Sequence, residues 1–211
     1  MNRNIIISLI WLGVFLTNQK IVAQTSIAGP TCVIVGNEYQ YLITRNISND
    51  STLQICVTGG VILNEDDSLC KNGTFSQIHV IWNESELHHL ILSNGSNSFL
   101  LQVSTTNELM PGIIDSSSII QVVYPDSTPA AIICPPSSGG NCEPVYSYSW
   151  QQSADGLDWE EVMAQNAAFL EFKQPLAQTT YFRRKVTELT SQSIGYSNIS
   201  VITVIQRPAI P

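Results

Sequence analysis

The five cysteines are the residues in this chain best suited to covalent chemistry: Cys32, Cys56, Cys70, Cys134 and Cys142. None of their spacings gives the close pair of ligands that a zinc site uses, so we expect disulfides and no bound metal. Cys134 and Cys142 bracket a turn-rich loop, and turn residues also lie between Cys56 and Cys70. We therefore predict the bridges Cys134–Cys142 and Cys56–Cys70, with Cys32 as the remaining thiol.

One tryptophan lies beside carboxylates, a pattern that can serve binding. Trp159 is flanked by Asp158 and Glu160. An exposed indole ring with carboxylates nearby suits the apolar face and the hydroxyl groups of a sugar. Trp159 is the candidate glycan contact of this chain, against the simpler interpretation of an ordinary surface residue.

The other tryptophans follow a different pattern. Tyr146, Tyr148 and Trp150 alternate with polar residues, which places the three aromatic rings on one face of a strand. We expect Trp150 to fill the core of a β-sandwich and interpret Trp82 in the same way. The alternative for the Tyr146–Trp150 face is a platform on which sugars stack.

Three charged or imidazole runs complete the candidates. In Arg183-Arg184-Lys185, strand alternation points Arg184 away from the other two, so we expect solvated charges paired with acidic neighbours and no anion site. The run 64–68 has oxygen ligands but lacks the spacing of a calcium loop, so we expect a solvated turn. His88 and His89 diverge on a strand and are not expected to chelate a metal.

No hydrolase, phosphate-loop or dinucleotide motif is present, so we predict no catalytic residue, no cofactor and no enzyme activity.

The elements that must position these residues are strands. Alternating or β-branched runs recur at 39–44, 77–82, 146–151 and 199–205, separated by Gly, Pro, Asn and Asp. Helical periodicity is almost absent. This pattern predicts an all-β chain made of two sandwiches. We place the boundary at the proline-containing segment 124–129, which gives modules at 25–124 and 129–206 and a linker or tail at 207–211.

The N-terminus predicts export. Arg3 precedes the apolar run 5–16, which is too short to cross a bilayer, and small residues follow near Ala23. Residues 1–23 are therefore expected to be a signal peptide, and the mature protein to be secreted, extracellular or at a cell surface, with no transmembrane segment. The formal net charge of −8 disfavours nucleic acid as a partner.

Two stretches resemble known modules. Residues 146–156, Trp159, the segment 179–186 and Tyr196-Ser197-Asn198 resemble the immunoglobulin-like modules of large secreted Bacteroidota proteins. Residues 27–30, 56–60 and 80–83 resemble the PKD-like module that often precedes them, although Ile55 stands near the position where that module usually has a tryptophan. The order of the two is similar to the N-terminal region of RHS/YD-repeat surface proteins.

The resemblance implies a non-catalytic, structural or adhesive role at the cell surface, as the N-terminal part of a larger RHS-like protein. The expected partner is a protein or a glycan of the cell surface. The alternative function is a carbohydrate-binding module. The two differ in the exposure of the aromatic residues, because a sugar-binding face needs exposed rings whereas a structural module buries them.

Overall fold

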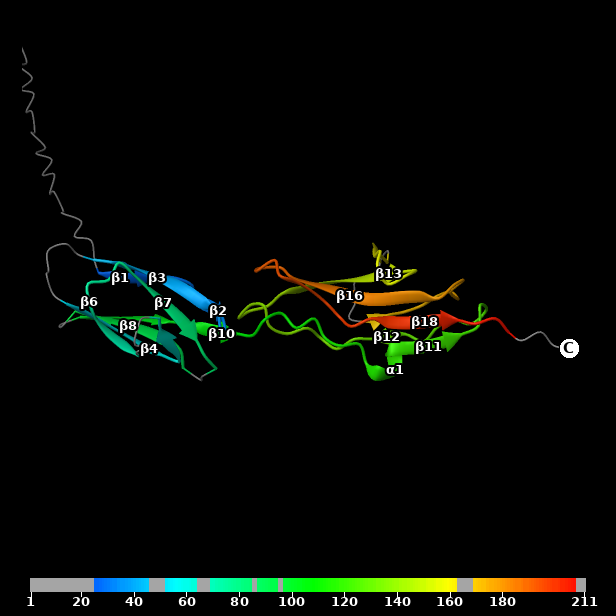
Figure 1. Ribbon diagram of the computed structural model, residues 1–211, viewed down its shortest axis with the longest axis horizontal. Helices are drawn as coiled ribbons and strands as arrows, with labels where there is room; N and C mark the ends of the chain where they lie inside the picture. Colours follow the sequence, from blue (N-terminus) through cyan, green and yellow to red (C-terminus); the bar gives the residue numbers. More distant parts are fainter. Residues whose placement is uncertain are drawn as a thin grey trace, which may run out of the picture.

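A computed structural model describes residues 25–45, 52–63, 69–84, 87–94, 97–162 and 169–207. The predicted signal peptide 1–23 and the acidic run 64–68 lie outside these residues. The described chain forms two β modules placed end to end along one long axis (Figure 1). No helix in this part of the chain is long and apolar enough to span a bilayer.

The first module is a sandwich of two antiparallel sheets. One sheet has the order β1 (Ser26–Ala28), β3 (Glu38–Thr44), β7 (Gln77–Trp82), β5 (Gly60–Ile62). The other has the order β6 (Cys70–Gly73), β4 (Leu53–Thr58), β8 (His89–Ser93), β9 (Ser98–Gln102). A short parallel pair, β2 (Cys32–Ile34) and β10 (Ser104–Thr106), forms the end of the module that faces the second one (Figure 1).

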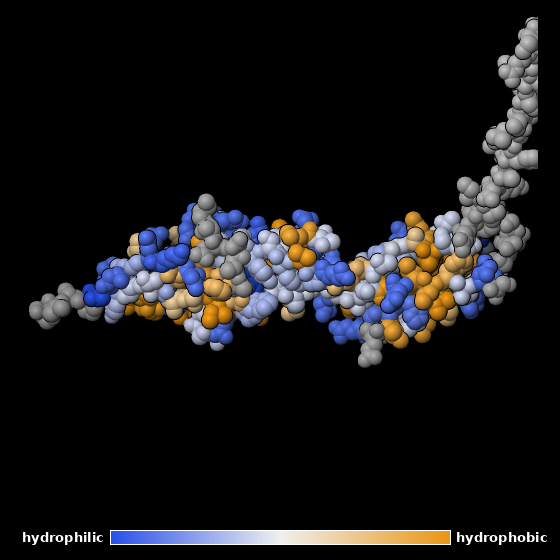
Figure 2. Space-filling view, turned by 180° about the vertical axis from the view of Figure 1, so that it is seen from behind, coloured by the Kyte–Doolittle hydropathy of each residue, from blue (hydrophilic) through white to orange (hydrophobic). Residues whose placement is uncertain are grey.

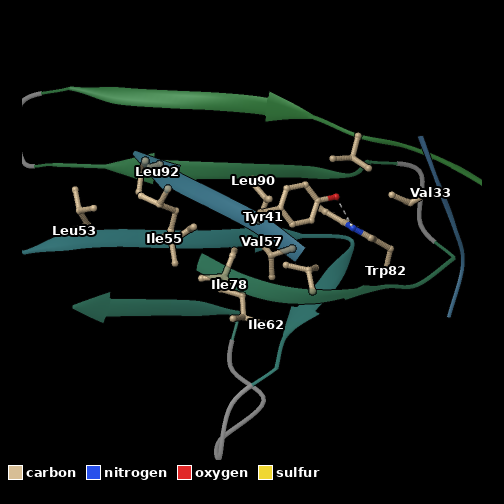
Figure 3. Packing of buried hydrophobic residues seen from close by; sticks show 13 residues of the cluster. Val33, Tyr41, Leu53, Ile55, Val57, Ile62, Ile78, Trp82, Leu90 and Leu92 are labelled. Atoms are coloured by element: carbon tan, nitrogen blue, oxygen red, sulfur yellow. Dashed lines mark hydrogen bonds between the residues drawn. The ribbon is translucent and has the colours of Figure 1, made fainter. Parts of the chain in front are cut away.

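Strand alternation fills the core of this module. Tyr41 and Ile43 of β3 and Ile78, Val80 and Trp82 of β7 point inward and are buried. The indole nitrogen of Trp82 donates to the Tyr41 hydroxyl at 3.0 Å (Figure 3), so two large aromatic side chains are buried without an unpaired polar group. Burial raises the pKa of Tyr41 to about 12. The expected burial of Trp82 is confirmed.

The second module is built on one large sheet. Its order is β11 (Ile120–Val123), β18 (Ser200–Val204), β16 (Thr180–Glu188), β13 (Tyr146–Ser153), β14 (Glu160–Glu161), and β17 (Ile194–Tyr196) also pairs with β16. A two-stranded sheet, β12 (Ile132–Ile133) with β15 (Phe169–Leu170), and the short helix α1 (Ser116–Ile119) complete the module. Trp150 is fully buried against Phe182, Ile132 and Leu170, which confirms its predicted place in the core.

The module boundary differs from the predicted one at 124–129. Strand β11 pairs in parallel with β18, from Ile120 opposite Val201 to Val123 opposite Val204, so residues 120–123 belong to the second module and not to the first. The buried side chain of Ile114 also lies in the second core. The first module therefore ends with β10 at Thr106, and the connector comprises residues 107–113.

Candidate functional site

The alternation of β16 divides its charged residues between two faces. Arg184 points to the face opposite Arg183 and Lys185, as predicted, and that face is the core. Lys185 lies 3.8 Å from Glu161, which agrees with the expected solvated ion pair. Arg183 and Arg184 do not fit that expectation, because aromatic rings and backbone carbonyls surround them instead of carboxylates.

Arg183 lies between two aromatic rings on the outer face of the sheet. Its guanidinium carbon lies 4.1 Å from the ring centre of Trp159 and 4.2 Å from that of Tyr196. Its Nε donates to the side-chain oxygen of Gln151 on the neighbouring strand at 2.8 Å. The three stacked groups form a Trp159–Arg183–Tyr196 stack, in which each cation–π contact contributes about 0.5–1 kcal/mol.

The turn before β14 positions Trp159. Oδ1 of Asp155 accepts hydrogen bonds from the backbone N–H groups of Leu157 at 2.8 Å and Asp158 at 3.1 Å, and from the Ser153 hydroxyl at 2.9 Å. These bonds, that from the Leu157 N–H first, lower the pKa of Asp155. The turn is thus fixed by its own side chain, and it presents a half-buried Trp159 at a defined angle.

A depression of about 370 Å³ adjoins this tryptophan. Its lining includes Trp159, Gln152 and the carboxyl groups of Asp155, Asp158 and Glu160. Gln152 donates to Glu160 at 2.8 Å, which holds both side chains in place. An aromatic wall next to amide and carboxylate oxygens is a combination that can bind a sugar or an organic cation.

Two buried charges on the inner face of β16 tie loops to the sheet. The guanidinium of Arg184 donates to the carbonyls of Cys134 at 2.9 Å, Pro111 at 2.6 Å and Pro135 at 2.5 Å, and it lies over the ring of Tyr148. The prediction of a solvated Arg184 is wrong. Its position is two residues from Phe182 and two from Val186, both buried, so the alternation that predicted its direction also indicated its burial.

Glu188 ends the same inward row. Its carboxylate accepts the N–H groups of Ser191 at 2.6 Å, Val145 at 3.1 Å and Thr190 at 3.1 Å. These bonds, that from the Ser191 backbone above all, lower the pKa of Glu188 to about 2. The residue holds the turn between β16 and β17 and the start of β13, and nothing in the sequence marked it as more than a strand charge.

The cysteine pairing is confirmed in one bridge and wrong in the other. Cys56 and Cys70 lie opposite each other on β4 and β6 and are joined. Cys142 is bonded to Cys32 and not to Cys134, with the two Cα atoms 5.8 Å apart. Cys134 is a free, buried thiol of the second core, and burial raises its pKa. The second disulfide therefore links the two modules.

The connector reinforces this junction. Met110 and Ser138 exchange two backbone hydrogen bonds of 2.8 and 3.0 Å, and the N–H of Gly140 donates to the carbonyl of Asn107 at 2.8 Å. Gly139 has φ +74°, and a Cβ there would lie 2.1 Å from the carbonyl oxygen of Glu108, so only glycine fits. On the other side, β10 is paired with β2 of the first module, so the junction is held by backbone pairing and by Cys32–Cys142.

The two histidines diverge, as predicted. His88 is buried and its Nε2 lies 2.8 Å from the carbonyl oxygen of Asn83, whereas His89 lies on the opposite side of the strand. The described ranges contain no group of three or more side chains able to ligate a metal.

The exposed apolar side chains of the first module include Leu69, Leu87 and Leu100, and Figure 2 shows apolar atoms gathered over one side of that module.

Comparisons with known proteins give a match of one family model to part of the chain. A family model described as "Domain of unknown function (DUF8696)" matches residues 110–206, which begins within the connector and ends with the second sandwich. No curated protein matches the chain.

Several solved structures are similar in fold. The C-terminal 282-residue fragment of intimin, in complex with the intimin-binding domain of its translocated receptor, shares 11% identity at a TM-score of 0.44, with 86% of this chain and 64% of that one covered. Domains A168–A170 of titin share 10% sequence identity with this chain at a TM-score of 0.45, with 87% of this chain and 66% of the titin fragment covered. The insect immune protein hemolin shares 10% sequence identity at a TM-score of 0.44, with 90% of this chain and 49% of hemolin covered. The chain spans less than two thirds of each of these three structures. Its own strands form an all-β chain of two modules in tandem, as the sequence predicted.

Proposed function

We propose that this protein is a non-catalytic, secreted module pair with a structural and adhesive role at a cell surface. The observation that carries the proposal is the disulfide between Cys32 of the first module and Cys142 of the second. A flexible tether needs no such bond, whereas a rigid spacer that holds a binding surface at a fixed distance and orientation does. The end-to-end arrangement of the modules fits a spacer (Figure 1).

The covalent chemistry supports the proposed location. Disulfides persist in oxidising compartments and are rare where thiols are kept reduced. Four of the five cysteines are bonded, and the fifth is enclosed in a core where it is protected from oxidation. The apolar N-terminal run expected to direct export agrees with this location.

The use of the buried charges supports a structural role. Arg184 and Glu188 are the two fully buried charged side chains of the second module among the described residues. Both bind backbone groups of loops, and neither is directed into an open cleft. Their charge stabilises the module and is not presented to a substrate.

The finer proposal is that the pair forms the N-terminal part of an RHS/YD-repeat surface protein. It is supported by the sequence resemblance of the stretches 27–30, 56–60 and 80–83 in the first module and 146–156, 179–186 and 196–198 in the second. The full-length gene product tests it directly, since repeats following residue 211 are expected and a different downstream domain would contradict it.

Nuclear spin relaxation of the mature chain tests the rigid spacer. We expect amides of both modules to report one common rotational correlation time. In the Cys32→Ser, Cys142→Ser double variant, the two modules are expected to report shorter and separate values. The matched control is Cys56→Ser with Cys70→Ser, which removes a disulfide inside the first module and is expected to leave the coupling intact. Independent tumbling of the wild-type modules would refute the rigid spacer, and unchanged coupling in the double variant would refute the role of the disulfide in it.

A further inference from the structure

The depression beside Trp159 lies at the turn between β13 and β14 and combines an aromatic ring with acidic residues. The Trp159–Arg183–Tyr196 stack fixes the indole ring, because the guanidinium covers one of its faces at 4.1 Å and is itself anchored to Gln151. A ligand at this site can therefore contact only the other face or an edge of the ring. Such a preorganised ring loses little conformational entropy when a ligand binds.

The polar lining of the depression is acidic. Asp155, Asp158 and Glu160 all border it, and the guanidinium of Arg183 lies over the rings of Trp159 and Tyr196. Asp155 is committed to its own turn, and Glu160 accepts from Gln152. The carboxylate of Asp158 forms no hydrogen bond or ion pair within the part of the chain that the structure describes. It remains available to accept from a ligand.

We propose that this depression binds a pyranose that carries a protonated amine, that is, a hexosamine residue of a glycan. The apolar C–H face of the ring packs on the indole of Trp159, the ammonium group pairs with Asp158, and hydroxyl groups donate to Glu160. The negative lining disfavours uronic and sialic acids, because their carboxylates would meet three like charges. The volume of about 370 Å³ is sufficient for one or two sugar rings. This inference names a partner for the adhesive role proposed above, and it rests on that proposal only for the claim that the module pair is adhesive.

Titration of the mature chain with oligosaccharides tests the site. The probes are a glucosamine tetramer, its N-acetylated counterpart and a galacturonic acid tetramer, followed through the indole N–H resonance of Trp159. We expect the glucosamine tetramer to shift this resonance saturably, the N-acetylated form to bind about tenfold more weakly, and the galacturonic acid tetramer not to bind. Raising the salt concentration from about 0.05 to 0.5 M is expected to weaken the binding severalfold, because one partner of the pair is an exposed carboxylate.

Three variants separate the site from general effects. Trp159→Ala is expected to weaken binding about tenfold or more, and Asp158→Asn, which preserves shape and removes charge, about three- to tenfold. The matched control is Tyr124→Ala, since Tyr124 is also an exposed aromatic of the second module with an arginine, Arg207, over its ring at 5.1 Å. It is expected to leave binding unchanged.

Four results would overturn the proposal. The first is that none of the three sugars binds, and the second is that the galacturonic acid tetramer binds as tightly as the glucosamine tetramer. The third is that Trp159→Ala leaves the binding of the glucosamine tetramer unchanged. The fourth is that a tetralysine peptide binds as tightly as the glucosamine tetramer, which would make the site a general one for basic peptides. The relaxation experiment is independent of these outcomes. Loss of sugar binding with the modules still coupled refutes the hexosamine site alone, whereas uncoupled modules refute the rigid spacer whatever binds.

Discussion

Replacing Arg184 by methionine tests whether a buried cation holds the second module together. Arg184 is fully buried, and its guanidinium satisfies the backbone carbonyls of Pro111, Cys134 and Pro135. Methionine has a similar length and fills part of the same space, but it has no hydrogen to donate. Arg184→Met therefore leaves the carbonyls of Cys134 and Pro135 without this donor. The carbonyl of Pro111 loses one of its two donors and keeps the hydroxyl of Ser137 at 3.1 Å.

The magnitude follows from those carbonyls. A buried acceptor that loses its partner costs about 1–3 kcal/mol, so the carbonyls of Cys134 and Pro135 together set a range of roughly 2–6 kcal/mol. Two effects favour the lower part of the range. Water can enter to solvate the carbonyls, and the variant no longer has to desolvate a guanidinium, a cost that lowers the pKa of Arg184 in the native chain. We expect a loss of about 2–4 kcal/mol, a large part of the margin of a module of this size.

Urea denaturation followed by hydrogen exchange and mass spectrometry measures this loss for each module separately. Peptides of the second module are expected to lose protection in Arg184→Met, and those of the first module to change little. Arg184→Lys is expected to fall between, because an ammonium group cannot reach all three carbonyls with a planar fork. The control is Lys185→Met, next in sequence but outward, with an expected loss below about 1 kcal/mol. A free energy of unfolding in Arg184→Met within about 1 kcal/mol of wild type would refute the reasoning.

Three further outcomes are expected. Replacing Cys56 and Cys70 by serine opens a loop with a sequence separation of 14 and is expected to lower the unfolding free energy of the first module by about 3 kcal/mol in urea titrations; no change would show that the bridge is dispensable. The folded pKa of Glu188, about 2, lies below its ordinary 4.5, so its contribution to stability is complete above pH 4.5 and is lost as the pH falls towards 2. The melting temperature of the second module should fall over that range, less steeply in Glu188→Gln; equal slopes would contradict the assignment. The thiol of Cys134 should resist iodoacetamide in the native chain and react fully in urea, and fast labelling of the native chain would contradict its burial.

Alternation along the strands carried most of what could be predicted about the cores. The aromatic face of 146–150 and the face of 78–82 were assigned inward from period two alone, and Trp150 and Trp82 are fully buried. The same rule gave the direction of Arg184. Its burial was missed because a charged side chain was assumed to stay solvated, although its neighbours in the inward row, Phe182 and Val186, are apolar.

The module boundary could not be derived in this way. A linker between domains and a loop inside a domain need the same turn residues, so the prolines at 125 and 129 fit either. The deciding fact is that β11 pairs with β18, about 80 positions further along the chain. Such a pairing depends on the packing of the whole sheet, and no local pattern reports it.

The candidate site was found in part. Trp159 and its two acidic neighbours were identified from composition, whereas the contributions of Arg183 and Tyr196 depend on three strands that meet only in the folded sheet. The residue types of the stack were visible in the sequence. Their juxtaposition was not. Trp159 directly precedes β14, Arg183 lies on β16 and Tyr196 on β17, and these strands are brought together by the pairing of β13 with β14 and β16 and of β16 with β17.

The cysteine pairing shows how a small entropic preference can lose to packing. Closing a short loop instead of one about tenfold longer is favoured by only about 2 kcal/mol, which is the whole advantage of Cys134–Cys142 over the observed separation of 110. Packing opposes this entropic advantage. Cys134 lies in the second core with Ile132 and Trp150, and withdrawing its side chain to reach Cys142 would open a cavity whose free-energy cost is comparable to the advantage of the shorter loop. Cys32 lies on β2, whose partner β10 leads directly into the connector. Once the modules have folded, Cys142 is therefore held beside Cys32, and the bond forms between modules because each core has already fixed where its cysteine lies.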